Sequence, residues 1–251
     1  MRFFLKILIL GSAGLVGSSL GRVLSKVNDY EILKASRADA NLFDLSETKK
    51  LIESFHPNVV INAAAKVGGI GLNQEQPGEL FYDNLIMGTN LLEQARENNV
   101  EKFIALGTVC SYPKFTPIPF KEESIWDGYP EETNAPYGLA KKMLLVQSQA
   151  YRQQYNFQSI MVIPTNLYGP NDNFDDKSSH VIPALIKKIY QAKKENLKNI
   201  SLKQNLEITM ETLLKLLELQ ESIEELFIEK LMSLDLQKLL MVIVLKKSKK
   251  K

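Results

Sequence analysis

The sequence predicts a doubly wound α/β fold, in which a parallel sheet is covered by helices on both faces. Short apolar runs alternate along the chain with longer amphipathic segments, which is the pattern of a repeated strand–helix unit. The apolar runs are nearly continuous, as expected for strands buried on both sides. In such folds ligands bind beyond the carboxyl ends of the strands, so chemistry-bearing residues are sought there.

Run length separates the predicted strands from the predicted helices. Five runs rich in Val and Ile are too short for typical helices. The predicted strands are Phe3–Leu10, Tyr30–Lys34, Val59–Asn62, Phe103–Leu106 and Ser159–Ile163. The predicted helices are Leu15–Lys26, Glu47–Phe55, Gly78–Asn98, Pro136–Tyr155 and His180–Glu195. This alternation assigns residues 1–165 to one dinucleotide-binding domain.

The last quarter of the chain has a different composition. No glycine follows Gly169, no proline follows Pro183, and Leu, Glu and Lys dominate from Ser201 onward. Such residues favour helix, but an α/β domain would keep using turn residues. We therefore expect residues 166–200 to begin a substrate-binding region, and residues 201–251 to form an atypical helical and basic tail.

Overall composition excludes several classes of protein. The net charge of +2 gives no basic field for nucleic acid, and the terminal KKSKKK is predicted to be a solvated tail. No apolar stretch reaches 18 residues, so no membrane span is expected. The start resembles a secretory signal in composition, but Lys6 interrupts it and we interpret it as a buried strand. With Cys110 as the single cysteine, no intrachain disulfide can form, which favours the cytoplasm.

The stretch GSAGLVG after the first predicted strand is typical of a dinucleotide-binding loop. It places Gly11, Gly14 and Gly17 directly between a strand and a helix. In this motif the first glycine allows the tight turn, the second lets the backbone approach a pyrophosphate, and the third lets helix pack closely on strand. The N–H groups and positive end of the helix then attract phosphate oxygens.

The end of the second predicted strand indicates which dinucleotide binds. NAD sites usually offer a carboxylate there for the ribose hydroxyls, whereas this chain has Ser36 and Arg37. A guanidinium suits a 2′-phosphate, so NADP(H) is favoured over NAD. Asp44 has two interpretations, a contact to the adenine or a cap of the helix that follows.

The stretch NAPYGLAKK places a tyrosine and a lysine on one helix face. Tyr137 and Lys141 are four residues apart, behind Pro136, which suits a first turn, and Asn134, which suits a cap. A phenol with a pKa near ~10 is a poor acid or base at neutral pH. An ammonium one turn away, together with an oxidised nicotinamide, would lower that pKa and make the phenol useful.

Several segments together resemble one family, over residues 1 to about 200. They are the glycine loop, AAAKVGG (Ala63–Gly69), LGTVCSYPK (Leu106–Lys114), NAPYGLAKK (Asn134–Lys142) and PTNLYGPNDNFDDKSSHVIPAL (Pro164–Leu185). These segments are similar to those of the GDP-L-fucose synthases, a family of extended short-chain dehydrogenases/reductases with a Rossmann-like fold. The resemblance implies NADPH-dependent epimerisation and reduction of GDP-4-keto-6-deoxy-D-mannose.

The resemblance also implies roles for individual residues. Tyr137 would give its proton to the ketone oxygen, Lys141 would hold the nicotinamide ribose, and Thr108 stands where the family usually has serine. The implied cofactor-binding residues are Gly11, Gly14, Leu15, Val16, Gly17, Arg37, Asp44, Ala64 and Lys141.

Cys110 and His180 match the family's epimerising pair. Protons next to a ketone are acidic, and inversion needs one group to remove a proton and another to return it. A thiol and an imidazole titrate closest to neutral pH and suit both parts. From the residues alone, Cys110 could instead be a small buried hydrophobe and His180 a helix cap.

The remaining implied contacts concern the substrate and a second copy of the chain. Lys66, Asn166 and Lys188 stand at substrate-contacting positions, and no metal is expected. Family members commonly dimerise through two helices, for which Gly78–Asn98 and Pro136–Tyr155 are the candidates.

The sequence motifs that the family usually has in this region are absent from this chain after residue 200. We expect Ser201–Lys251 to be a divergent or frame-shifted end that leaves the substrate domain incomplete. Three hypotheses remain: an active enzyme whose tail substitutes structurally, an inactive NADP-binding fragment, and an interaction protein whose helical tail packs on another chain. Another nucleotide-sugar epimerase or dehydratase is the alternative activity.

Overall fold

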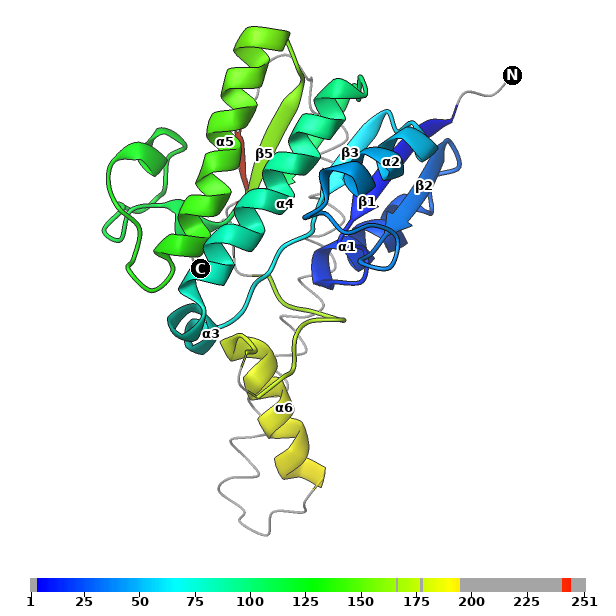
Figure 1. The fold of residues 1–251 in the computed structure, drawn as a ribbon. Helices are drawn as coiled ribbons and strands as arrows, with labels where there is room; N and C mark the ends of the chain where they lie inside the picture. Colours follow the sequence, from blue (N-terminus) through cyan, green and yellow to red (C-terminus); the bar gives the residue numbers. More distant parts are fainter. Residues whose placement is uncertain (1–3, 166, 177, 195–240, 245–251) are drawn as a thin grey trace.

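A computed structural model of the chain describes residues 4–165, 167–176, 178–194 and 241–244. Its centre is a six-stranded parallel sheet with the strand order β2-β1-β3-β4-β5-β6 (Figure 1). The strands are β1 (Leu5–Leu10), β2 (Tyr30–Ala35), β3 (Val59–Asn62), β4 (Lys102–Leu106), β5 (Ser159–Pro164) and β6 (Met241–Val244). The predicted doubly wound fold is confirmed.

Helices connect these parallel strands. They are α1 (Leu15–Leu24), α2 (Leu45–Phe55), α3 (Ile70–Glu75), α4 (Pro77–Glu97), α5 (Ala135–Tyr155) and α6 (Val181–Lys194), with short 3-10 helices η1 (Val109–Ser111) and η2 (Glu123–Trp126). The long helices α4 and α5 lie side by side across one face of the sheet (Figure 1). Within the described ranges, no helix is long and apolar enough to cross a membrane.

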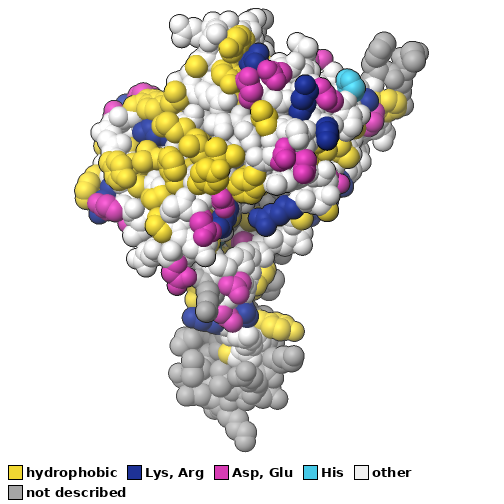
Figure 2. Space-filling view, viewed as in Figure 1, with side chains coloured by type: hydrophobic (Ala, Val, Ile, Leu, Met, Phe, Trp, Pro, Cys, Tyr) yellow, Lys and Arg dark blue, Asp and Glu magenta, His cyan; other side chains and the backbone are white. Residues whose placement is uncertain are grey.

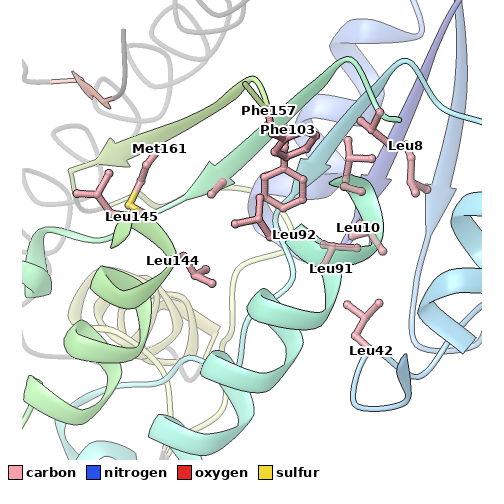
Figure 3. Packing of buried hydrophobic residues seen from close by; sticks show 14 of the residues in the cluster. Leu8, Leu10, Leu42, Leu91, Leu92, Phe103, Leu144, Leu145, Phe157 and Met161 are labelled. Atoms are coloured by element: carbon pink, nitrogen blue, oxygen red, sulfur yellow. The ribbon is translucent and has the colours of Figure 1, made fainter. Parts of the chain in front are cut away.

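The strands β1, β3, β4 and β5 are buried on both faces, so alternate residues belong to two separate cores. The core under α4 and α5 includes Leu8, Leu10, Phe103, Leu144 and Met161 (Figure 3). The core on the opposite face, which includes α1, contains Ile7, Ile9, Leu20, Ile61 and Val162. Burial on two sides explains why these runs read as continuous apolar sequence.

The strand order reverses direction at β1. The chain runs from β1 outward to β2, and then crosses to the other side of β1 to form β3. Beyond the carboxyl ends of β1 and β3, the two following loops meet at Gly11 and Ala63. This crevice is where doubly wound sheets bind their ligands.

Two predicted elements differ in the structure. The helix predicted at Gly78–Asn98 begins at Pro77, and α3 precedes it; Pro77 has no N–H and suits a first turn, so it separates the two helices. Of the predicted helical tail, the structure describes Met241–Val244, which pair with β5 as a strand. The run MVIV is mostly β-branched and suits the edge of a sheet.

Candidate active site

The three glycines of the first loop form a turn with the geometry of a phosphate cradle, here called the glycine cradle, and each is required for a different steric reason. Gly11 has a φ of 71°, and a Cβ there would lie 2.7 Å from the Ala63 carbonyl and from the Ala64 nitrogen. At Gly17 a Cβ would lie 2.2 Å from the Gly11 oxygen, so α1 packs directly on the turn. Gly14 meets no atom closer than 3.5 Å, which leaves its face open. This is the arrangement that the sequence motif predicts.

The first turn of α1 is free to receive an anion. Its N-cap is Gly14, which supplies no side-chain cap, and the first turn holds no acidic residue. Leu15 and Val16 lie partly buried in this turn. The backbone N–H groups at the start of a helix need partners, and phosphate oxygens supply them.

At the end of β2, Arg37 is exposed, and none of the described residues gives it a hydrogen bond or an ion pair. Sequence reasoning missed Asp39, whose carboxylate turns back and accepts from the Ser36 N–H at 2.7 Å and its hydroxyl at 2.9 Å. These hydrogen bonds lower the pKa of Asp39. The nearby acid is thus engaged within its own turn, while Arg37 is available. Asp44 caps α2 by accepting from the N–H groups of Ser46 and Glu47.

Thr108, Cys110 and Tyr137 come together because η1 packs against the first turn of α5. The Ser111 hydroxyl donates to the Gly138 carbonyl at 2.8 Å, in the interior. A Cβ at Gly138 would lie 2.2 Å from the Cys110 oxygen, so the two backbones touch. The Thr108 hydroxyl accepts from the Cys110 N–H at 3.2 Å and is close enough to the Tyr137 phenol to influence its pKa. A proton donor, a hydroxyl and a thiol therefore share one corner.

The protonation of this corner differs from the prediction. Burial raises the pKa of Tyr137, the charge of a Cys110 thiolate acts in the same direction, and the hydrogen bond to Thr108 opposes both. The expected lowering by Lys141 does not contribute to the pKa of Tyr137 in this structure, and the raising effect of burial is the largest cause. Burial also lowers the pKa of Lys141 to about 8. At neutral pH Tyr137 is therefore a protonated phenol, the form that can donate.

Polar contacts of Asn84 and Lys66 hold the loop that follows β3. Asn84 on α4 is buried; its side-chain oxygen accepts from the Lys66 N–H at 3.1 Å, and its nitrogen donates to the Lys66 carbonyl at 2.9 Å. The Lys66 ammonium pairs with Glu79, and with Asp83 at 3.3 Å, and both carboxylates raise the pKa of Lys66. Sequence reasoning missed Asn84; an amide at a buried helical position was the available signal.

His180 approaches from a different segment, just before α6. It is exposed, and none of the described hydrogen bonds joins it to Cys110 or Tyr137. Burial raises the pKa of Asp172, and His180 acts electrostatically in the opposite direction. Two residues before His180, the Ser178 carbonyl accepts from the Gly69 N–H at 2.9 Å. This contact ties the His180 segment to the loop after β3.

The substrate positions expected on α6 are only partly placed. Lys187 donates to the Phe174 carbonyl at 3.1 Å and pairs with Asp176 at 2.8 Å, whereas Lys188 is exposed. Asn166 lies outside the described residues. Among the residues that are described, no three His, Cys, Asp or Glu side chains gather as a metal site.

Residues 7–211 match the sequence pattern of the NAD dependent epimerase/dehydratase family. The chain belongs to this family. One relative is a GDP-L-fucose synthase of Sinorhizobium fredii, which is 43% identical over 197 residues that cover 78% of this chain and 62% of the relative. The chain thus spans less than two thirds of that relative's length.

Solved structures of the family show the same fold. A GDP-L-fucose synthetase from Naegleria fowleri bound to NADP superimposes with a TM-score of 0.72 at 30% identity, covering 79% of this chain and 65% of that one. A GDP-6-OMe-4-keto-L-xylo-heptose reductase from C. jejuni gives 0.74 at 29% identity, covering 82% and 60%. Residues 7–211, which match the family, include the glycine loop and the segment from Thr108 to Lys141.

We expect the substitution Lys141→Met to stabilise the protein at pH 7. Because the pKa of Lys141 falls from 10.5 in the unfolded chain to about 8 in the fold, the unfolded state binds more protons between these values. Stability of the parent therefore rises with pH across that window, and the penalty below it is on the order of 3 kcal/mol. Urea unfolding of parent and variant from pH 7 to 10.5 measures this.

The difference between parent and variant should shrink as pH rises through the window. Lys188→Met, at an exposed position, controls for the loss of a lysine. A parent–variant difference that stays constant from pH 7 to 10.5 would contradict the buried-ammonium explanation.

Proposed function

We propose that this chain catalyses the NADPH-dependent epimerisation and reduction of GDP-4-keto-6-deoxy-D-mannose to GDP-L-fucose. The observation that carries the proposal is the shared corner of Thr108, Cys110 and Tyr137, which follows β4 at the same carboxyl edge of the sheet as the glycine loop after β1. The corner offers a proton donor for a ketone oxygen and a thiol for the neighbouring carbon. The family's GDP-sugar members supply the substrate class.

The cradle fits a dinucleotide, and NADP in particular. Gly14 leaves room for a pyrophosphate at the start of α1, and the free guanidinium of Arg37 suits a 2′-phosphate. Lys141 is 3% exposed and has none of the described residues as a hydrogen-bonding partner, so its ammonium is available for ribose hydroxyls. When bound, a reduced nicotinamide supplies the hydride for the ketone carbon.

The chain's own groups perform the proton transfers. Tyr137, whose raised pKa keeps it protonated, donates to the ketone oxygen as the carbonyl is reduced. The Thr108 hydroxyl orients that oxygen through a second hydrogen bond. Before reduction, Cys110 and His180 remove and return protons at the carbons flanking the ketone. Because a working Cys110 must stay reduced, we propose a cytoplasmic location.

A second candidate is reduction of a different GDP-sugar, without the two inversions. The likeness to the heptose reductase favours it, since the same Tyr137 corner serves ketone reduction alone. Proton exchange at the flanking carbons separates the candidates. A third outcome, in which NADPH binds without turnover, would identify an inactive cofactor-binding chain.

Replacing Tyr137 with phenylalanine should lower kcat for NADPH oxidation by roughly 10²–10⁴-fold, because the proton donor is lost. The NADPH dissociation constant should change less than about twofold, since the phenol is not a phosphate ligand. Absorbance of NADPH with GDP-4-keto-6-deoxy-D-mannose measures the rate, and fluorescence measures binding. Tyr129→Phe is the matched control, because Tyr129 is 63% exposed on a neighbouring loop.

Deuterium uptake from D₂O into the sugar is measured with the parent, with Tyr137→Phe and with Cys110→Ser. Deuterium should still enter the flanking carbons of the sugar with Tyr137→Phe, and should not with Cys110→Ser. Full turnover by Tyr137→Phe would overturn the assigned role, and turnover without deuterium uptake would establish the second candidate.

Arg37→Ala should weaken NADPH binding by about 10- to 100-fold, the worth of a charge-assisted hydrogen bond. NADH binding should hardly change, because NADH lacks the 2′-phosphate that Arg37 would contact. Titration of both cofactors with parent and variant gives the ratio. An equal loss for both cofactors would refute the specific contact.

We also propose a homodimer formed by the exposed faces of α4 and α5. These helices expose Phe81, Tyr82, Met143 and Val146, and Figure 2 shows a broad hydrophobic area on the face that carries them. Apolar patches of this kind mark interfaces more often than plain surface.

A glutamate at the centre of such an interface would be buried without a partner. Val146→Glu should therefore convert the dimer to a monomer in sedimentation velocity, at concentrations where the parent stays dimeric. Val27→Glu is the control, because Val27 has nearly the same exposure, 40% against 41%, but follows α1. A parent that sediments as a monomer would exclude this interface.

A further inference from the structure

We propose that Asn73 on α3 is a positioning residue, which sets the spacing between the His180 segment and the Tyr137 corner. His180 and Tyr137 lie in segments that none of the described hydrogen bonds joins directly. A chain of short polar contacts nevertheless joins the segments, and it passes through α3. The catalytic consequence rests on the proposed function, whereas the mechanical coupling does not.

The first half of this connection joins the His180 segment to the start of α3. The Gly69 N–H donates to the Ser178 carbonyl at 2.9 Å. A Cβ at Gly69 would lie 2.7 Å from the Ser179 oxygen, so the two backbones are in contact and a side chain does not fit. The Gly69 carbonyl in turn accepts from the Asn73 N–H at 3.2 Å. Movement of the His180 segment is therefore passed to α3.

The second half joins α3 to the first turn of α5. Asn73 is 6% exposed, and its side-chain nitrogen donates to the side-chain oxygen of Asn134 at 2.9 Å. The Asn134 nitrogen donates to Glu131 at 2.6 Å, which fixes the orientation of the amide with its oxygen toward Asn73. The Asn134 carbonyl accepts from the Gly138 N–H at 2.8 Å, next to Tyr137.

Glu131 makes this end of the connection rigid. Its carboxylate also accepts from the Thr133 hydroxyl at 2.7 Å and from the N–H groups of Thr133 and Asn134, both at 3.1 Å. These bonds lower the pKa of Glu131. Asn134 occupies the N-cap position of α5, yet its side chain makes no cap bond and serves the connection to α3 instead.

The connection has a catalytic use because the groups it joins act on one sugar. A misplacement of about 1 Å in a reacting group can cost roughly 10²-fold in rate. Cys110 and Tyr137 share a corner, whereas none of the described hydrogen bonds joins His180 to them, so the link through Asn73 is the described polar connection between the two segments. Breaking the link should therefore harm proton exchange at the sugar more than cofactor binding.

Asn73→Ala tests the connection, with Gln74→Ala as the matched control on the exposed side of the same helix. The chain has two histidines, so NMR can follow the His180 ring with His56 as an internal reference. At one pH, Asn73→Ala should shift the His180 resonances, leave those of His56 in place, and differ from Gln74→Ala. Gly69→Ala breaks the other end of the connection and should shift His180 as well.

The kinetic arm measures deuterium uptake into the sugar. Asn73→Ala should slow it by roughly 10- to 100-fold, with the NADPH dissociation constant unchanged within about twofold. If the parent does not turn over, the NMR result alone decides the coupling, and the proposed function fails separately. His180 resonances that stay in place in Asn73→Ala and in Gly69→Ala would overturn the proposal, even if one variant also lost stability.

Discussion

The site depends on direct contact between backbones at glycines that leave no room for a side chain. Gly17 lets α1 sit on the turn at Gly11, and Gly138 lets α5 sit on the carbonyl of Cys110. The first contact aims a helix start at the crevice between β1 and β3. The second brings the thiol, the hydroxyl and the phenol to one corner. Both contacts exclude a Cβ on steric grounds alone.

Burial sets the electrostatics of this corner more than the pairing of charges does. Lys141 is almost fully buried, and the resulting cost lowers its pKa to about 8. Tyr137 experiences the same low-dielectric surroundings, which disfavour its anion and keep it protonated. The protein thus holds an ammonium in a costly environment, one helical turn from a neutral phenol, and strongly shifted pKa values of this kind cluster at functional sites.

The loops at the carboxyl edge of the sheet are held by side-chain amides as well as by hydrophobic packing. Asn84 clamps the loop after β3, and Asn73 and Asn134 link that loop's helix to α5. An amide both donates and accepts, so each of these residues can hold two segments at once. The apolar cores form the sheet and its helices, whereas the amides fix the geometry of the site.

Local signals in the sequence were enough for β1 to β5, most helices, the glycine loop and the shared face of Tyr137 and Lys141. Each depends on residues only a few positions apart, through periodicity, turn chemistry or backbone freedom. Two elements, by contrast, were not predicted: the six-residue helix α3, which is too short to show a clear helical period, and β6, whose four residues lie in a segment rich in helix-forming residues.

Only the tertiary structure decided the rest. The contact of Gly138 with Cys110, the Asn84 clamp and the raised pKa of Tyr137 each need segments that are distant in sequence to pack together. A pKa depends on how much water the surrounding segments exclude, and a backbone contact depends on where two elements cross. Neither quantity exists until the sheet, α4 and α5 have assembled, so the sequence by itself could name the proposed reacting groups but not their surroundings.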